Sequence, residues 1–142
     1  MSDFIHLHNH THYSLQDGAC TVDSLIAAAK KNDMKAVALT DHGVMYGIAE
    51  FYRKAIKEGI KPIVGMEAYV VSEGSRTDRG KAEDGSLPNG QAGGKKRAKH
   101  YNHLILLAKN NEGYKNLSKL STLGYTEGFY YKPRIDLELL RQ

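Results

Sequence analysis

Residues 36–70 read AVALTDHGVMYGIAEFYRKAIKEGIKPIVGMEAYV, and this stretch decides the fold class. Two apolar runs of strand length, at 36–40 and 62–70, enclose a helical pattern of apolar residues at 45–56 that Gly59 closes. Continuously apolar strands separated by a helix are typical of a parallel sheet whose faces are covered by helices. The sequence therefore predicts an α/β fold.

The same alternation of strands and helices continues on both sides of this stretch. The remaining expected elements are a strand at 4–7, a helix at 22–29 that Thr21 caps, a strand at 103–108, a helix from 110 or 111 to 123 and a further helix from about 135. Four parallel strands do not close a (β/α) barrel, which needs about 250 residues. We therefore expect residues 1–142 to form the N-terminal portion of one barrel-like domain.

Composition places the chain among ordinary globular proteins. It has 142 residues, of which 41% are apolar and 25% charged, and this balance excludes collagen-like, coiled-coil and wholly disordered chains. No apolar run approaches the ~20 residues of a membrane span. A single cysteine, Cys20, excludes an internal disulfide framework, and the first residues lack the pattern of a signal peptide. We therefore expect a cytoplasmic protein without a membrane partner.

Positive charge gathers in the second half of the chain, where residues 72–142 hold 13 basic and 8 acidic side chains. Much of the excess lies in a glycine-rich segment at about 72–99 that has few apolar residues. Its length and composition favour a solvated, mobile loop. The alternative is a nucleic-acid contact, in which phosphates are bound by Lys95, Lys96, Arg97 and Lys99.

A histidine-rich segment, HLHNHTH at 6–12, follows the first expected strand. Side chains two residues apart on an extended chain project to the same side, so His8 and His10 can offer two imidazoles to one cation. Leu, Asn and Thr interrupt the segment, which argues against an expression tag. The spacing predicts a metal site.

Further candidate ligands lie where parallel strands should end together. Asp41 and His42 follow the second expected strand, Glu67 lies near the end of the third, and Asp17 lies in the first loop. Each residue also has a structural interpretation, because Asp17 precedes a glycine in a turn-like pair, Asp41 can cap a helix and Glu67 can lie on a surface edge. Their coincidence at one rim favours a site.

Other chemistries lack their essential residues. The chain contains no G-x-S-x-G nucleophile elbow and no G-x-G-x-x-G after a strand, and the glycine-containing run at 85–90 is not followed by Lys and Ser or Thr. Cys20 beside the histidines is a possible thiol nucleophile, although a lone cysteine next to alanine is more typical of a small buried apolar residue.

Several short motifs, in this order and spacing, resemble those of the PHP (polymerase and histidinol phosphatase) domain family, in the branch joined to bacterial replicative DNA polymerases. They are HNHT at 8–11, YSLQDGA at 13–19, TDHG at 40–43, PIVGME at 62–67, HLILLAKN at 103–110 and GYKNL at 113–117. The resemblance covers almost the whole chain. It implies a distorted (β/α)7 barrel that holds up to three divalent ions, with Zn or Mn favoured, and it implies further ligands beyond Gln142.

Carried over position by position, the resemblance implies six metal ligands: His8, His10, Asp17, His42, Glu67 and His103. His103 begins its expected strand instead of ending it, so this ligand rests on the resemblance alone. The resemblance leaves the roles of His6, His12 and His100 open.

The implied activity is that of a metal-dependent phosphodiesterase, acting as a 3′→5′ proofreading exonuclease in a DNA-synthesising subunit. DNA, the remainder of the polymerase and other replisome subunits are the implied partners. Three carboxylates are candidates for catalysis: Glu67 bridging two ions, Asp17 fixing their geometry and Asp41 orienting a ligating histidine. Two alternatives stay open, a structural metal-binding module and a free-standing phosphatase of the histidinol-phosphate type, which GYKNL disfavours.

Overall fold

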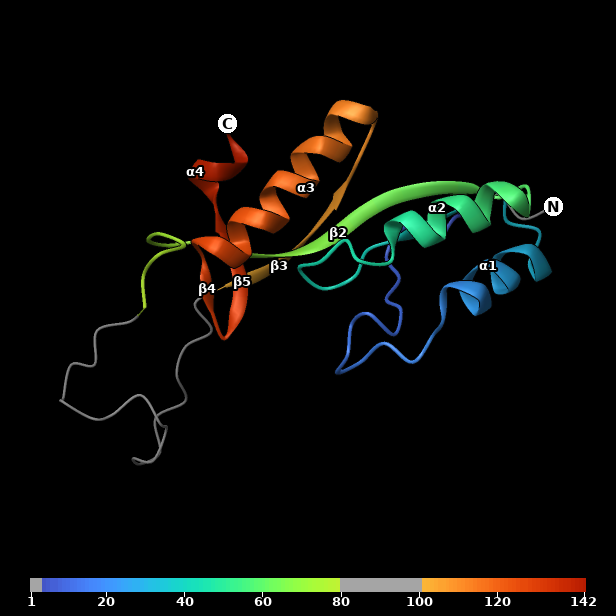
Figure 1. Cartoon of the computed structure of the whole chain (residues 1–142), viewed down its shortest axis with the longest axis horizontal. Helices are drawn as coiled ribbons and strands as arrows, with labels where there is room; N and C mark the ends of the chain where they lie inside the picture. The colour runs from blue at the N-terminus through green and yellow to red at the C-terminus, as the bar shows by residue number, and fades with distance from the viewer. Residues whose placement is uncertain (1–3, 80–100) are drawn as a thin grey trace.

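The computed structural model describes residues 4–79 and 101–142, and its sheet is built on one long strand, β2 (Lys61–Val71) (Figure 1). The first half of β2 pairs in parallel with β1 (Ala36–Leu39). Its second half pairs with β3 (Asn102–Leu107) in antiparallel and with β5 (Lys132–Asp136) in parallel, and β4 (Phe129–Tyr130) pairs antiparallel with β5. A mixed α/β fold is thereby confirmed.

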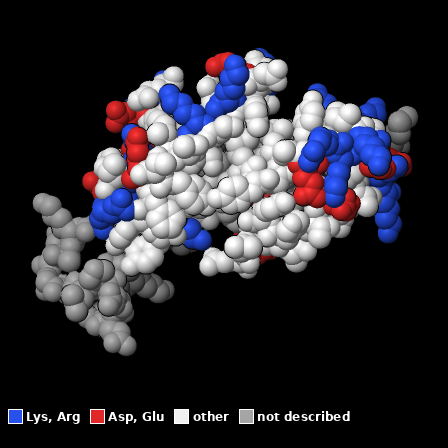
Figure 2. All heavy atoms as spheres, in the orientation of Figure 1, with Lys and Arg blue, Asp and Glu red and all other residues white. Residues whose placement is uncertain are grey.

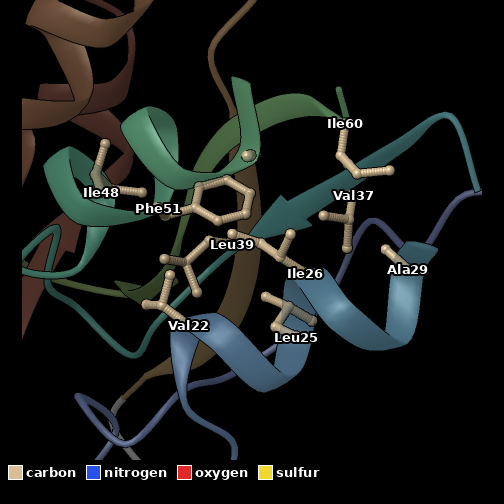
Figure 3. Close-up of a cluster of buried hydrophobic side chains, with 10 residues drawn as sticks. Val22, Leu25, Ile26, Ala29, Val37, Leu39, Ile48, Phe51 and Ile60 are labelled. Atoms are coloured by element: carbon tan, nitrogen blue, oxygen red, sulfur yellow. The ribbon is translucent and has the colours of Figure 1, made fainter. Parts of the chain in front are cut away.

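The first half of the chain builds a core of its own between β1 and two helices, α1 (Val22–Lys31) and α2 (Ile48–Lys57). Figure 3 shows side chains of α1 pointing toward β1 and toward Phe51 of α2. We call this cluster the first core; it comprises Val22, Leu25, Ile26, Ala29, Val37, Leu39, Ile48, Phe51, Ala55 and Ile60, with Cys20 packed at its edge. As predicted, Thr21 caps α1, because its hydroxyl accepts a hydrogen bond from Ser24 N at 3.1 Å.

The second half of the chain packs α3 (Asn111–Thr126) and α4 (Leu137–Leu140) beside the far end of β2 (Figure 1). Its buried cluster, here called the second core, comprises Met66, Ala68, Val70, Ile135 and Leu139. Three of these residues belong to β2 itself. The second half therefore depends on β2 for much of its burial.

Opposite charges meet on the outer faces of α1 and α2, where Figure 2 shows Lys and Arg beside Asp and Glu. Lys54 Nζ lies 2.7 Å from Asp23 Oδ2, and Lys30 Nζ lies 2.7 Å from Glu58 Oε2, so two ion pairs join the helices. These pairs contribute little to stability because water and salt screen exposed charges. None of the described helices is both long and apolar enough to cross a membrane.

Two expected strands differ from the prediction. The strand expected at 103–108 runs antiparallel to β2, with Met66 opposite Leu106 and Tyr69 opposite His103. Residues 4–7 are not a regular strand; the segment lies along β1, whose Ala38 N donates to His6 O at 2.9 Å. The described strands form an open sheet, and the closed (β/α)7 barrel stays a prediction.

The β4–β5 hairpin was not predicted, and neither was the anchoring of residues 72–79. The buried Arg134 of β5 donates from Nη2 to Arg76 O at 2.9 Å and to Asp78 O at 2.7 Å. Arg76 in turn forms ion pairs with Asp136 and Glu127. The beginning of the basic segment is thereby held against β5. The rest of that segment, including Lys95, Lys96, Arg97 and Lys99, lies outside the described residues, as does His100.

Candidate metal centre

Glu67, in the middle of β2, is the centre of a cluster of imidazoles, and its side chain is only 4% exposed. Its Oε2 lies 2.5 Å from His8 Nε2 and 2.9 Å from His10 Nε2. Its Oε1 contacts His103 Nδ1 and lies 3.5 Å from His42 Nδ1. Each carboxylate oxygen therefore faces two imidazoles.

Three different elements bring these histidines to Glu67. His8 and His10 alternate along the extended segment beside β1, and His42 follows β1 and forms a parallel bridge with Glu67. His103 lies near the start of β3, opposite Tyr69. Because β3 is antiparallel, its beginning meets the end of β2. This direction explains how a histidine at the start of a strand reaches the same rim.

Gly43 lets the chain turn away from the sheet directly after His42. Its φ of 65° lies in the left-handed region, and its N donates to Glu67 O at 2.8 Å. A side chain here would place Cβ 2.6 Å from Pro133 Cγ. The turn also delays α2 until Ile48, three residues later than the apolar pattern predicted.

Asp41 is buried and holds the loop that follows His10. Its Oδ1 accepts hydrogen bonds from Thr11 N at 2.6 Å and Ser14 Oγ at 2.8 Å, and its Oδ2 accepts from Thr11 Oγ1 at 2.8 Å. Orientation of a ligating histidine by Asp41 stays a prediction. In the described structure Asp41 fixes the backbone next to His10, because its oxygens accept hydrogen bonds from Thr11 and Ser14.

Asp17 lies on the exposed rim and approaches the cluster through His42. Its side chain is 57% exposed, and Oδ2 lies 2.8 Å from His42 Nε2. This hydrogen bond is the main reason that the pKa of Asp17 is lowered. When His42 Nε2 carries the donated proton, Nδ1 presents a lone pair toward Glu67. Asp17 itself belongs to neither of the two groups of converging ligand atoms, His8–His10–Glu67 and His42–Glu67–His103.

The protonation states of the buried groups suit a cation. Burial lowers the pKa of His10, and the charge of His42 lowers it further. Burial raises the pKa of Glu67, but hydrogen bonds with His103 and His8 and the charges of His42 and His10 outweigh burial and leave a net lowering. At neutral pH the cluster therefore holds an ionised carboxylate and a neutral His10, the forms that bind metal ions.

Two sets of ligand atoms converge in the cluster, and they share Glu67. One set is His8, His10 and Glu67, the other is His42, Glu67 and His103, and the ligand atoms of each set lie within 4.8 Å of one another. His10 Nδ1 and His42 Nδ1 are buried without a hydrogen-bond partner in the described structure. His8 Nε2 and His10 Nε2 are 3.0 Å apart, so both cannot carry a proton there without repulsion. This donor set fits divalent cations.

Tyr69 is a site residue that the sequence interpretation missed. Its ring stacks on His42, with centroids 5.8 Å apart and planes at 17°, and meets the ring of His103 at 5.0 Å and 79°. Burial raises its pKa to about 12, so the hydroxyl stays neutral. Its position two residues after Glu67 on the same strand was the available signal, because residues i and i+2 share a face.

His6 and His12 lie outside the two ligand sets. The ring of His6 packs edge-on against Phe4, with centroids 4.7 Å apart, and the exposed His12 lies beside the ring of Tyr13.

The fold and the cluster define an α/β domain with a candidate metal centre, whose histidines and Glu67 meet at one rim of a sheet. A family model described as the PHP domain matches residues 6–142. The chain belongs to the PHP domain family, and the family resemblance drawn from the motifs is confirmed.

The individual relatives are DNA polymerase III alpha subunits. The chain is 51% identical over 141 residues to the DNA polymerase III subunit alpha of Aquifex aeolicus, covering 99% of this chain and 11% of that protein. Identity to the Borreliella burgdorferi subunit is 48% over 141 residues, with 99% and 11% covered. Identity to the Deinococcus radiodurans subunit is 49% over 144 residues, with 98% and 10% covered. The chain thus spans about a tenth of the length of the curated relatives it matches.

Proposed function

We propose that this chain is the N-terminal part of a DNA polymerase III alpha subunit, and that its PHP domain is a metal-dependent phosphodiesterase that removes nucleotides from a DNA 3′ end. The observation that carries the catalytic part is the position of Glu67, each of whose oxygens faces two imidazoles. The identity to DNA polymerase III alpha subunits supports the assignment to a polymerase. The remainder of that subunit, other replisome subunits and DNA are its proposed partners.

In this proposal Glu67 would be shared by two cation sites. His8 and His10 would hold one ion together with Glu67, and His42 and His103 would hold the other. Mixed imidazole and carboxylate ligands suit Zn and Mn. The third ion implied by the resemblance belongs to the complete domain, together with ligands from other parts of the protein.

Bound divalent ions lower the pKa of a coordinated water and stabilise charge on the departing oxygen of a phosphodiester. The chain's own residues prepare the site for this chemistry. Asp17 Oδ2 holds the proton on His42 Nε2 and so directs the Nδ1 lone pair inward. Asp41 fixes the loop after His10, and Tyr69 packs against His42 and His103, which keeps both rings in place.

Metal binding is the first test, and it uses the chain stripped of metal by a chelator. Isothermal titration with Zn²⁺ and with Mn²⁺ is expected to show saturable binding that Glu67→Gln and His10→Gln weaken by more than about 100-fold, beyond the roughly 10- to 100-fold cost of losing an outer hydrogen-bond partner. His12→Gln is the matched control, because His12 is an exposed histidine of the same segment outside both ligand sets. Equal weakening by His12→Gln would contradict the assigned ligands.

Hydrolysis is the second test, and it uses the complete polymerase subunit with DNA labelled near its 3′ end. Glu67→Gln and His10→Gln are expected to abolish metal-dependent release of the terminal nucleotide, whereas DNA synthesis continues because the two active sites are separate. His12→Gln should retain both activities. A folded, metal-loaded wild-type subunit that releases no nucleotide would establish the cluster as a structural module.

A further inference from the structure

A second feature lies beside the metal centre, a cavity of about 400 Å³ whose lining includes Asp17, His42 and His103. Its volume lies within the range of about 300–1,000 Å³ that is usual for pockets that bind small molecules. A larger cavity of about 700 Å³, between α2 and the start of α3, is lined by none of the cluster residues. Of these two cavities lined by described residues, the smaller is the one from which a bound molecule can reach the metal centre.

Aromatic side chains form much of the wall of this smaller cavity. Tyr46 is 65% exposed and Phe129 is 46% exposed, although both are large rings on an otherwise folded rim. Tyr125 stacks on Phe129, with centroids 5.8 Å apart and planes at 20°, and its hydroxyl is hydrogen-bonded to Tyr46. Burial and this hydrogen bond raise the pKa of Tyr125 to about 12, so the wall carries no charge of its own there.

Lys132 supplies a positive charge between the aromatic wall and the metal centre. Its Nζ lies 3.2 Å from Gln16 Oε1 and 5.4 Å from the centroid of the Tyr69 ring. Its charge also contributes to the lowered pKa of Asp17. A cation at this place favours a ligand whose anionic group points toward the cluster while its flat apolar part lies against the rings.

We propose that this cavity, here called the aromatic pocket (Tyr46, Tyr125, Phe129 and Lys132), binds one nucleotide at the end of a single strand. The aromatic rings stack on the base, and Lys132 contacts the phosphate on the side of the metal centre. This inference rests on the proposed phosphodiesterase function, because it assigns the place of that reaction's substrate.

The chemistry of stacking sets the specificity of the aromatic pocket. Every base has a π-face, so stacking discriminates little among the four bases. A base within a duplex must first leave its pair and its neighbours, which costs a few kcal/mol and least at a mismatch. The aromatic pocket therefore selects an unpaired strand end over a paired one, whatever the base.

The test measures binding without hydrolysis, using this chain in excess chelator and a thymidine hexanucleotide labelled with fluorescein at its 5′ end. Anisotropy is expected to report saturable binding that Tyr46→Ala and Phe129→Ala each weaken by about 5- to 100-fold. Tyr46→Phe keeps the ring and should bind within about twofold of wild type. Lys132→Met should weaken binding and reduce the salt slope by about 0.7, the value for one single-strand phosphate.

Tyr52→Ala is the matched control, because Tyr52 is 52% exposed and lines the larger cavity. Its affinity is expected to equal that of wild type, and a hexanucleotide whose 3′ end is paired in a duplex should bind more weakly than the single strand. The proposal is contradicted if wild type shows no binding, or if Tyr52→Ala weakens binding as much as Tyr46→Ala. It is also contradicted if Tyr46→Ala and Phe129→Ala both bind normally while circular dichroism shows that they are folded.

Because the binding test is run in excess chelator, its result does not depend on metal-dependent hydrolysis, and the two proposals can fail separately. An inactive polymerase whose isolated chain still binds the strand end through Tyr46 and Phe129 would refute hydrolysis and retain the pocket. Normal hydrolysis by a subunit carrying both alanine substitutions, with unchanged KM for a single-stranded end, would retain hydrolysis and refute the pocket.

Discussion

The two halves of the molecule are stabilised in different ways. In the first half, α1 buries four of its ten residues, and the first core joins α1, β1 and α2. In the second half, α3 buries only Leu117 and Gly124 of sixteen residues, while Leu104 and Tyr114 stay exposed. The first half is therefore stabilised by its own core, whereas the second half is positioned by its packing against β2. The metal centre lies between them, with His8, His10 and His42 on one side and His103 on the other.

The largest effect is expected from Phe51→Ala in the first core. Phe51 is completely buried, so its truncation should lower the free energy of unfolding by about 3–5 kcal/mol, and Leu117→Ala on α3 should cost less, about 2–3 kcal/mol. Urea denaturation followed by circular dichroism measures both values. Tyr52→Ala, the neighbouring exposed position, should change stability by no more than about 0.5 kcal/mol. A larger cost at Leu117 than at Phe51 would reverse the comparison between the halves.

Metal binding should reduce the difference between the halves. A divalent ion at 100 times its dissociation constant is expected to raise the free energy of unfolding by about 2.7 kcal/mol. Because His103 belongs to β3 and Glu67 to β2, hydrogen exchange should slow in β3 as well as around His10. Slowing confined to the first half would show that the second ligand set stays empty. Removal of the ion by a chelator should reverse both effects.

Acid should weaken the second half through Asp136, the N-cap of α4. Burial raises its pKa, but hydrogen bonds from the backbone of Arg76 and Leu139 and from the Arg76 side chain outweigh burial, so the pKa falls below its ordinary value of 3.8. The ionised form is thus favoured by folding. Its contribution is present above about pH 4 and disappears as the pH falls through the folded-state pKa.

Asp136→Asn is the variant that isolates this contribution. It should lower the free energy of unfolding by about 2 kcal/mol at pH 7, since Arg76 loses its buried partner. The difference from wild type should shrink as the pH falls below 3.8, which urea denaturation at pH 7 and at pH 2.5 would show. A difference that is the same at both pH values would exclude ionisation of Asp136 as its cause.

The smallest effects are expected from the helix caps, Thr21 of α1 and Asn110 of α3. Asn110 Oδ1 accepts from Gly113 N at 3.0 Å, as Thr21 does from Ser24 N. Replacement of either cap by alanine should cost about 1 kcal/mol. In Asn110→Ala the first turn of α3 should also exchange its amide hydrogens faster, because few buried side chains hold that helix. Equal exchange at the two helix starts would contradict weaker anchoring of α3.

Apart from the strand expected at 4–7, the sequence predicted the elements of the first half well, because α1 and α2 each bury a face that their own periodicity reveals. The first core contains all four residues of the expected helical pattern, Val22, Leu25, Ile26 and Ala29. Thr21, the N-cap, lies directly before Val22, where both the pattern and α1 begin. The direction of β3 could not be predicted in this way, because an apolar run of strand length can form either a parallel or an antiparallel ladder.

The hairpin of β4 and β5 could not be predicted from the sequence for a different reason. Its reversal lies at Tyr131, whose φ is 61°, and a tyrosine gives none of the glycine or asparagine signal that tight hairpins usually carry. In the metal centre, His8, His10, His42 and Glu67 could be selected from their places at or after the ends of expected strands, whereas His103 was selected from the resemblance alone. The contacts of Asp41 with Thr11 and Ser14 could not be predicted, because they depend on how the loop folds back.

Both ligand sets contain Glu67, so their remaining residues determine the order in which the two sets can form during translation. Residues 8–71 contain the first set and the strand pairing that positions it, so His8, His10 and Glu67 can assemble once β2 has emerged. The second set needs His103 and therefore waits for at least 32 more residues, a delay of seconds at translation rates of about 5–20 residues per second. In the proposed two-ion centre, a nascent chain would accordingly complete one ligand set before it could complete the second.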